Sequence, residues 1–133
     1  METITVPAGT DSLYAVLDFI GEALSRAGVD QPAQNSYMLA AEEIFVNIAS
    51  YAYPSAQGSV TVSAAADTGS FVMVFSDSGM PYDPLSAAAP DILLPAQERE
   101  IGGLGLFLVK KLMDSVTYRY EDGRNILTVE KRI

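Results

Sequence analysis

The segment Ile101–Asp114, IGGLGLFLVKKLMD, places three glycines directly before an apolar run and is the strongest local signal in the chain. The run has the character of a core helix, which we predict over Gly102–Met113. Glycine inside a helix costs roughly 1 kcal/mol relative to alanine. Glycines at this helix start are explained if another group approaches the backbone closely, as a phosphate does when N–H groups at a helix start bind it. Close packing between helices is the alternative explanation.

Two common phosphate-binding motifs do not fit this segment. No Gly-Lys-Ser or Gly-Lys-Thr follows the glycines, which excludes a Walker loop. GGLGLFLV lacks the third glycine of the dinucleotide fingerprint, and the preceding AQERE is not a buried strand. If this helix start binds a phosphate, the site is of another kind.

The pattern of the remaining sequence predicts an α+β fold in one domain, 1–133. The predicted elements are, in order, a strand over Glu2–Val6, a helix from about Thr10 to Ala27, a helix from Pro32 to Tyr53, strands over Gly58–Ala66 and Ser70–Ser76 around the turn DTG, the helix over Gly102–Met113, and a hairpin in which VTYRY and ILTVEKRI flank EDGRN. Strands that meet through hairpins imply a mainly antiparallel or mixed sheet with the three helices on one face, a two-layer α/β sandwich.

Composition excludes several classes of function. Eight Lys and Arg against 17 Asp and Glu give a net charge of −9, which opposes binding to nucleic acid or to an anionic membrane. The chain has no cysteine and no histidine, so chemistry must use carboxylates, amides, hydroxyls and backbone. No signal peptide and no segment of ~20 apolar residues is present, and we therefore expect a cytoplasmic protein.

Two polar positions on the second predicted helix could carry chemistry. Glu43 and Asn47 are four residues apart, so their side chains lie one above the other on one face. The carboxylate could act as a base, and the amide oxygen could help to hold a hard cation such as magnesium. A solvated helix face is the alternative.

A third polar position follows the apolar strand FVMVF. In DSGMPYD, Asp77 could accept a hydrogen bond from an exocyclic amine, and Gly79 would let a flat ring lie against the backbone. An ordinary turn is the alternative, because Asp, Ser, Gly and Pro are all turn formers. A loop with four prolines continues from here to Ile101, and so long a loop in a small domain is usually functional or mobile.

The order of these motifs resembles one family. EEIFVN on a helix, DSGMPYDP after a strand, a loose loop and GGLGLFLVKKLMD resemble the N box and the two glycine boxes of the ATPase superfamily shared by gyrase, heat-shock chaperones, histidine kinases and mismatch-repair proteins. Within it, the short chain, the DxGxPxDP form and EREIGGLGLFLVKKLMD resemble the bacterial anti-sigma-factor serine kinases of partner-switching systems. The resemblance covers about Gln34–Ile133.

The resemblance implies ATP and Mg²⁺ as cofactors and a role for each matched residue. Asn47 would coordinate the magnesium that bridges the ATP phosphates, and Glu43 would activate the serine hydroxyl of a protein substrate. Asp77 would accept the adenine amino group, Gly79 would give the ring room, and Pro84–Glu100 would form a lid. The backbone that the phosphates approach would be that of Gly102, Gly103, Leu104 and Gly105. The sequence departs from the pattern at Tyr51, where many relatives have histidine, and at Tyr82, where phenylalanine is common.

The function that the resemblance implies is that of an ATP-dependent protein serine kinase and anti-sigma factor. Its partners would be a sigma factor and an antagonist protein that carries the acceptor serine, and relatives are commonly homodimers. The residues leave one alternative open, a regulatory module that senses ATP or ADP and switches partners without catalysis. The catalytic domain of a histidine kinase fits poorly, because the chain has no histidine to phosphorylate and no room for a dimerising helix pair.

Overall fold

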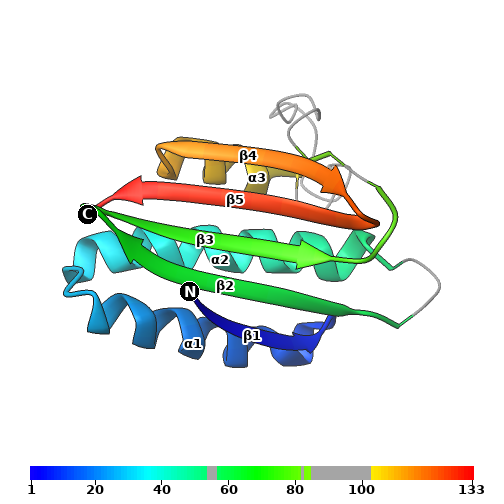
Figure 1. Cartoon of the computed structure of the whole chain (residues 1–133), viewed down its shortest axis with the longest axis horizontal. Coiled ribbons are helices and arrows are strands. Elements are labelled where there is room, and N and C mark those ends of the chain that lie inside the picture. The colour runs from blue at the N-terminus through cyan, green and yellow to red at the C-terminus, as the bar shows by residue number, and fades with distance from the viewer. Residues whose placement is uncertain (54–56, 82, 85–102) are drawn as a thin grey trace.

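The computed structural model describes residues 1–53, 57–81, 83–84 and 103–133 (Figure 1). This part of the chain contains three α-helices, one short 3₁₀ turn and five strands. The elements are β1 (Glu2–Pro7), α1 (Leu13–Arg26), α2 (Gln31–Tyr51), β2 (Ser59–Asp67), β3 (Ser70–Asp77), α3 (Gly103–Leu112), β4 (Ser115–Glu121) and β5 (Arg124–Arg132).

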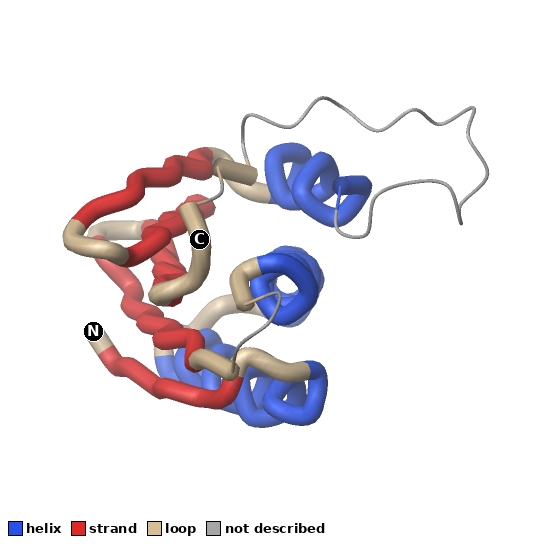
Figure 2. The backbone as a smooth tube through the Cα atoms, turned by 90° about the vertical axis from the view of Figure 1, so that its right-hand side faces the viewer, coloured by secondary structure: helices blue, strands red, loops and turns tan. Residues whose placement is uncertain are grey.

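The strands form one antiparallel sheet in the order β1-β2-β3-β5-β4. The helices lie together on one side of this sheet, as the edge-on view shows (Figure 2). The predicted two-layer sandwich is therefore confirmed. β3 and β5 are adjacent although α3 and β4 separate them in sequence, and their register pairs Asp77 with Asn125.

The two hairpins turn where the sequence predicted them. Thr68 and Gly69 have φ of 43° and 84°, and Asp122 and Gly123 have φ of 53° and 77°. Two consecutive residues with positive φ form the turn whose twist matches that of paired strands. In the first hairpin the turn is one residue shorter than predicted, because Asp67 still pairs with Ser70.

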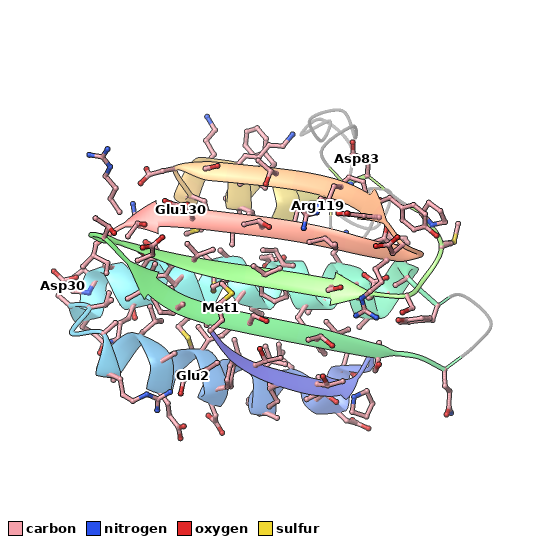
Figure 3. All side chains as sticks on the ribbon, in the orientation of Figure 1. Met1, Glu2, Asp30, Asp83, Arg119 and Glu130 are labelled. Atoms are coloured by element: carbon pink, nitrogen blue, oxygen red, sulfur yellow. The ribbon has the colours of Figure 1, made fainter. Side chains whose placement is uncertain are left out.

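The helix boundaries differ in detail from the predicted ones. Asp30 caps the start of α2 by accepting the N–H of Ala33 at 3.1 Å (Figure 3), and Pro32 takes a first-turn position as predicted. A short 3₁₀ turn, Thr10–Ser12, precedes α1, so Ser12 at the cap position already has helical dihedrals and its side chain makes no capping bond. α2 ends at Tyr51, two residues before the predicted end.

The core fixes α2 against the centre of the sheet. Tyr37 is fully buried and meets Phe71 of β3 edge to face, with ring centroids 5.1 Å apart. Its hydroxyl donates to the backbone carbonyl of Lys131 in β5 at 2.7 Å. Burial, and then the charges of Asp114 and Glu130, raise the pKa of Tyr37 to about 12, so the hydroxyl stays a donor. This anchor determines which residues of α2 face the ends of β3 and β5.

Candidate functional site

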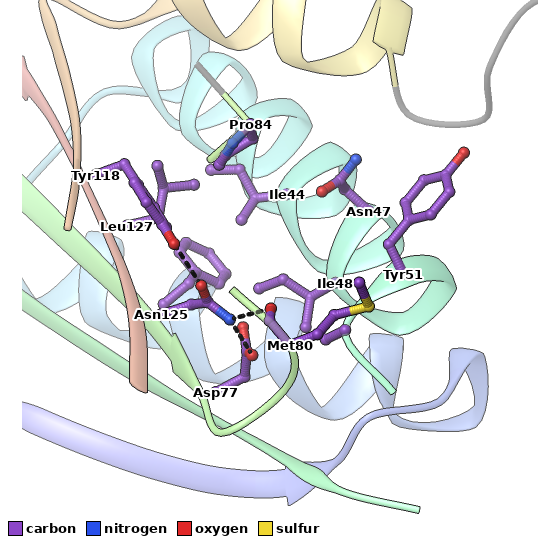
Figure 4. Close-up of a pocket in the computed structure, with 12 residues that line it drawn as sticks. Ile44, Asn47, Ile48, Tyr51, Asp77, Met80, Pro84, Tyr118, Asn125 and Leu127 are labelled. Atoms are coloured by element: carbon purple, nitrogen blue, oxygen red, sulfur yellow. Dashed lines mark hydrogen bonds between the residues drawn. The ribbon is translucent and has the colours of Figure 1, made fainter. Parts of the chain in front are cut away.

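A small cavity of about 30 Å³ lies between the C-terminal half of α2 and the adjoining ends of β3 and β5 (Figure 4). Its wall is largely apolar and includes Ile44, Ile48, Phe75, Pro84 and Leu127. Its polar lining residues are Asn47, Tyr51, Asp77, Tyr118 and Asn125. An apolar cavity with a few convergent polar groups is the common form of a ligand site. The two predicted residues Asn47 and Asp77 line it from opposite layers of the fold.

Asp77 ends β3 and is only 3% exposed. Its Oδ1 accepts two hydrogen bonds, from the backbone N–H of Gly79 at 2.8 Å and from Nδ2 of Asn125 at 2.9 Å. Oδ2 takes part in neither bond. Because an ionised carboxylate is an acceptor only, the carboxylate can offer Oδ2 to a ligand that brings an N–H group.

Asn125 is a site residue that the sequence did not reveal. It is 7% exposed, and besides Asp77 its Nδ2 donates to the carbonyl of Met80 at 2.9 Å. Its Oδ1 accepts the hydroxyl of Tyr118 at 2.5 Å. The sequence signal was the alternation of side chains along a strand: Asn125 lies on the same inward face of β5 as the buried Leu127 and Val129. A polar residue at a buried strand position is the observation that could have identified it.

The turn after Asp77 is attached to the end of α2. The N–H of Met80 donates to the carbonyl of Ala52 at 3.0 Å, and the N–H of Ser78 donates to the hydroxyl of Tyr53 at 2.8 Å. A Cβ at Gly79 would lie 2.2 Å from the Ala52 carbonyl oxygen. This contact requires glycine at position 79 independently of any ring that lies against it.

We expect Gly79→Ala to lower the free energy of unfolding by about 2 kcal/mol, because overpacking against rigid backbone costs roughly 1–3 kcal/mol. Urea unfolding followed by circular dichroism measures the change. Gly21→Ala in α1 is the matched control, since its added Cβ would meet only Met38 Cε at 3.8 Å. That variant is expected to be at least as stable as the wild type. Equal stability of Gly79→Ala and wild type would contradict the packing argument.

Asn47 carries an unsatisfied polar atom at the cavity. The residue is 5% exposed, and its Nδ2 has no hydrogen-bond partner within the described residues. A buried donor without a partner costs about 1–3 kcal/mol. Such an amide fits a ligand that brings oxygen atoms, and its own Oδ1 fits a magnesium ion that takes few protein ligands and keeps several waters. The described residues contain no group of three or more acidic side chains that could hold a metal by themselves.

Glu43 lies one turn before Asn47 on α2 and is half-buried. Burial, and then the charge of Glu42, raise the pKa of its carboxyl group. A carboxylate with a raised pKa is a better general base near neutral pH. Glu43 is not one of the residues that line the cavity, so the structure places it beside the site rather than in its wall.

The glycine-rich segment is described in part. α3 begins at Gly103, and Gly103, Leu104 and Gly105 form its first turn, whose backbone N–H groups have no partner within the helix. Gly102 lies outside the described residues. Of the predicted lid over 84–100, only Pro84 is described, and it is buried in the cavity wall. Tyr51 lines the cavity one turn after Asn47.

The sequence of this chain is similar to those of known proteins. Residues 6–131 match the model of the histidine kinase-like ATPase domain. The chain is 30% identical over 130 residues to the serine-protein kinase RsbW of Listeria monocytogenes, covering 94% of this chain and 83% of the relative. It is 26% identical over 128 residues to the serine/threonine-protein kinase BtrW of Bordetella bronchiseptica, covering 96% and 87%.

A solved structure supports the fold. The histidine kinase AdeS of Acinetobacter baumannii superposes with a TM-score of 0.53 at 12% identity, covering 99% of this chain and 68% of that one. Among the described residues, no helix is both long and apolar enough to cross a membrane. From the match over nearly its whole length, the chain belongs to the histidine kinase-like ATPase domain family.

Proposed function

We propose that this protein is an ATP-dependent protein serine kinase that also acts as an anti-sigma factor. The observation that carries the proposal is the pair formed by Asp77 and Asn47, one with an acceptor oxygen left over and the other with an unsatisfied donor, on the two sides of one apolar cavity. Its relatives RsbW and BtrW, which are serine and serine/threonine kinases by name, support the same activity.

The adenine ring would occupy the apolar part of the cavity. Its exocyclic amine would donate to Oδ2 of Asp77, and its faces would contact aliphatic side chains such as Ile48 and Leu127. The cavity as it stands is far smaller than the roughly 300–1,000 Å³ of typical ligand pockets, so nucleotide binding must widen it.

The phosphates would lie between α2 and the first turn of α3. The N–H groups at the start of α3 favour negative charge. Asn47 would hold Mg²⁺, which when bound neutralises phosphate charge. The backbone of Gly102, Gly103, Leu104 and Gly105 would let the phosphates approach, and the lid over 84–100 would cover them.

Transfer would then need only positioning and a base. The Oγ atom of the acceptor serine attacks the γ-phosphorus. The new Oγ–P bond forms as the bond to the β–γ bridging oxygen breaks, ADP leaves, and the serine proton passes to Glu43. The acceptor serine belongs to an anti-sigma-factor antagonist, and a sigma factor is the second partner. We also propose that two copies of this protein form a homodimer.

Calorimetric titration with ATP and ADP, with and without magnesium, tests nucleotide binding first. We expect ATP to bind more tightly when magnesium is present. Incubation with labelled ATP, magnesium and a cognate antagonist then tests transfer, which should label one serine of the antagonist. Absence of ATP binding would overturn the whole proposal, and binding without transfer would overturn the kinase.

One observation favours a second candidate, a module that senses ATP or ADP and exchanges partners without catalysis. Glu43 does not line the cavity in which the adenine would lie, so binding of the base would not depend on its carboxylate. This candidate predicts that Glu43→Ala leaves partner exchange intact and that no phosphate reaches a partner. Detection of phosphate transfer that requires Glu43 would exclude it.

A further inference from the structure

The end of the cavity that contains Asp77 has a fixed hydrogen-bond direction. Tyr118 donates to Asn125 Oδ1, and Asn125 Nδ2 donates to Asp77 Oδ1 and to the carbonyl of Met80 (Figure 4). If the amide of Asn125 were rotated by 180°, its oxygen would face two acceptors and its N–H groups would face the Tyr118 hydroxyl. The bonds therefore run in one direction, from the Tyr118 hydroxyl through the Asn125 amide to Asp77 and the Met80 carbonyl.

This direction controls what Asp77 presents to a ligand. The N–H of Gly79 and Nδ2 of Asn125 converge on Oδ1, at 2.8 Å and 2.9 Å. Both donors come from the protein, so the carboxylate keeps one orientation and directs Oδ2 away from them. A ligand edge that carries a donor is accepted there, and an edge that carries a carbonyl oxygen meets a second acceptor and is rejected.

We propose that Asn125 is the positioning residue through which this pocket selects 6-aminopurine over 6-oxopurine nucleotides, with Tyr118 holding its amide. The inference rests on the proposed function, since it assumes that a purine nucleotide binds beside Asp77. Asn125 acts through Asp77 and sits on β5, 48 positions further along the chain. Selectivity for the base is thus set by a strand pair and not by the turn alone.

The isosteric change Asn125→Asp tests the inference. It replaces the donor that faces Asp77 with a second carboxyl group, and two adjacent carboxyl groups share a proton. When that proton is carried on Oδ2 of Asp77, it can donate to a 6-oxo group. We expect ATP to bind at least ten-fold more weakly and the ratio of inosine triphosphate to ATP dissociation constants to fall at least ten-fold, because a site built on a hydrogen bond loses discrimination when its polarity changes.

A near-isosteric pair separates positioning from packing. Asn125→Thr keeps a hydroxyl donor toward Asp77, whereas Asn125→Val has the same shape without a donor. We expect the threonine variant to keep the preference for ATP over inosine triphosphate and the valine variant to lose about ten-fold of it. Tyr118→Phe, which retains the ring, should weaken ATP binding about five-fold. Circular dichroism of each variant verifies the fold. If Asn125→Asp does not fold, the comparison of the threonine and valine variants provides the test of the inference.

Fluorescence or calorimetric titration with the two nucleotides gives the ratios. An unchanged ratio in folded Asn125→Asp, or equal ratios in the threonine and valine variants, overturns the role of Asn125 while ATP binding by the wild type stands. If the wild type binds neither nucleotide, the proposed function fails and this inference fails with it. The wild-type titration therefore distinguishes the two failures.

Discussion

Replacing Asp77 with asparagine is expected to weaken ATP binding at least 100-fold. The variant keeps one oxygen for the N–H of Gly79 and the amide of Asn125, so the turn after β3 stays in place. The other oxygen becomes an NH₂ group, which faces the donor of the adenine amine. Loss of a hydrogen bond to a charged group and its replacement by two opposed donors cost about 3 kcal/mol or more together, and about 1.4 kcal/mol is a factor of ten in affinity.

Isothermal calorimetry with ATP and magnesium measures this effect. Asp18→Asn is the matched control, because Asp18 is exposed on α1 and the same change there removes one charge without touching the cavity. Its ATP affinity should equal that of the wild type. If a folded Asp77→Asn variant has a dissociation constant for ATP within a few-fold of the wild-type value, the adenine amine does not bind to this carboxylate.

Glu43→Gln is expected to reduce phosphate transfer to the acceptor serine by a factor of about 10²–10⁴, the usual contribution of a general base. ATP affinity should change less than two-fold, because Glu43 does not line the cavity proposed for adenine and the serine proton, not ATP, is its proposed partner. Single-turnover transfer of labelled phosphate at saturating ATP separates the two quantities. Retained transfer in Glu43→Gln would exclude Glu43 as the base and favour another acceptor of the serine proton.

The neighbouring Glu42 supplies the control for this prediction. Glu42→Gln makes the same chemical change one residue away, and it should retain transfer. The base must be ionised to work, and burial and Glu42 raise its pKa, so transfer by the wild type should decline with falling pH earlier than for an ordinary glutamate. Glu42→Gln removes one of these two causes. The acid limb of its pH profile should therefore shift toward lower pH.

Local sequence determined most of the fold for identifiable reasons. The turns at Thr68-Gly69 and Asp122-Gly123 follow from residues that tolerate positive φ, and the hydrophobic spacing in α1 and α2 places their buried faces. α2 ends two residues before the predicted end, because tertiary hydrogen bonds determine where it stops. Tyr53 leaves the helix, donates to the carbonyl of Ser59 and accepts the N–H of Ser78.

The candidate site also contains residues that local sequence predicts and residues that it does not. Asn47 and Asp77 stand in short motifs and were predicted, and the structure brings both to one cavity. Tyr118 and Asn125 belong to no local motif, so the sequence did not predict them. Only the register between β3 and β5 brings Asn125 to Asp77. The requirement for glycine at position 79 comes from the Ala52 carbonyl, which is close in space but distant in sequence. Such contacts become visible only when the strands are paired.

The hydrogen-bond chain to Asp77 begins on β4, which borders only β5 in the described sheet. An edge strand is held by one ladder of backbone bonds and belongs to the least stable part of a fold, which opens locally more often than the core. An opening of β4 would withdraw Tyr118 from Asn125 and leave the proposed nucleotide pocket less well ordered. The apparent affinity is the intrinsic affinity multiplied by the closed fraction. If the proposed site binds a nucleotide, anything that stabilises or displaces this strand would tune that binding from outside the pocket.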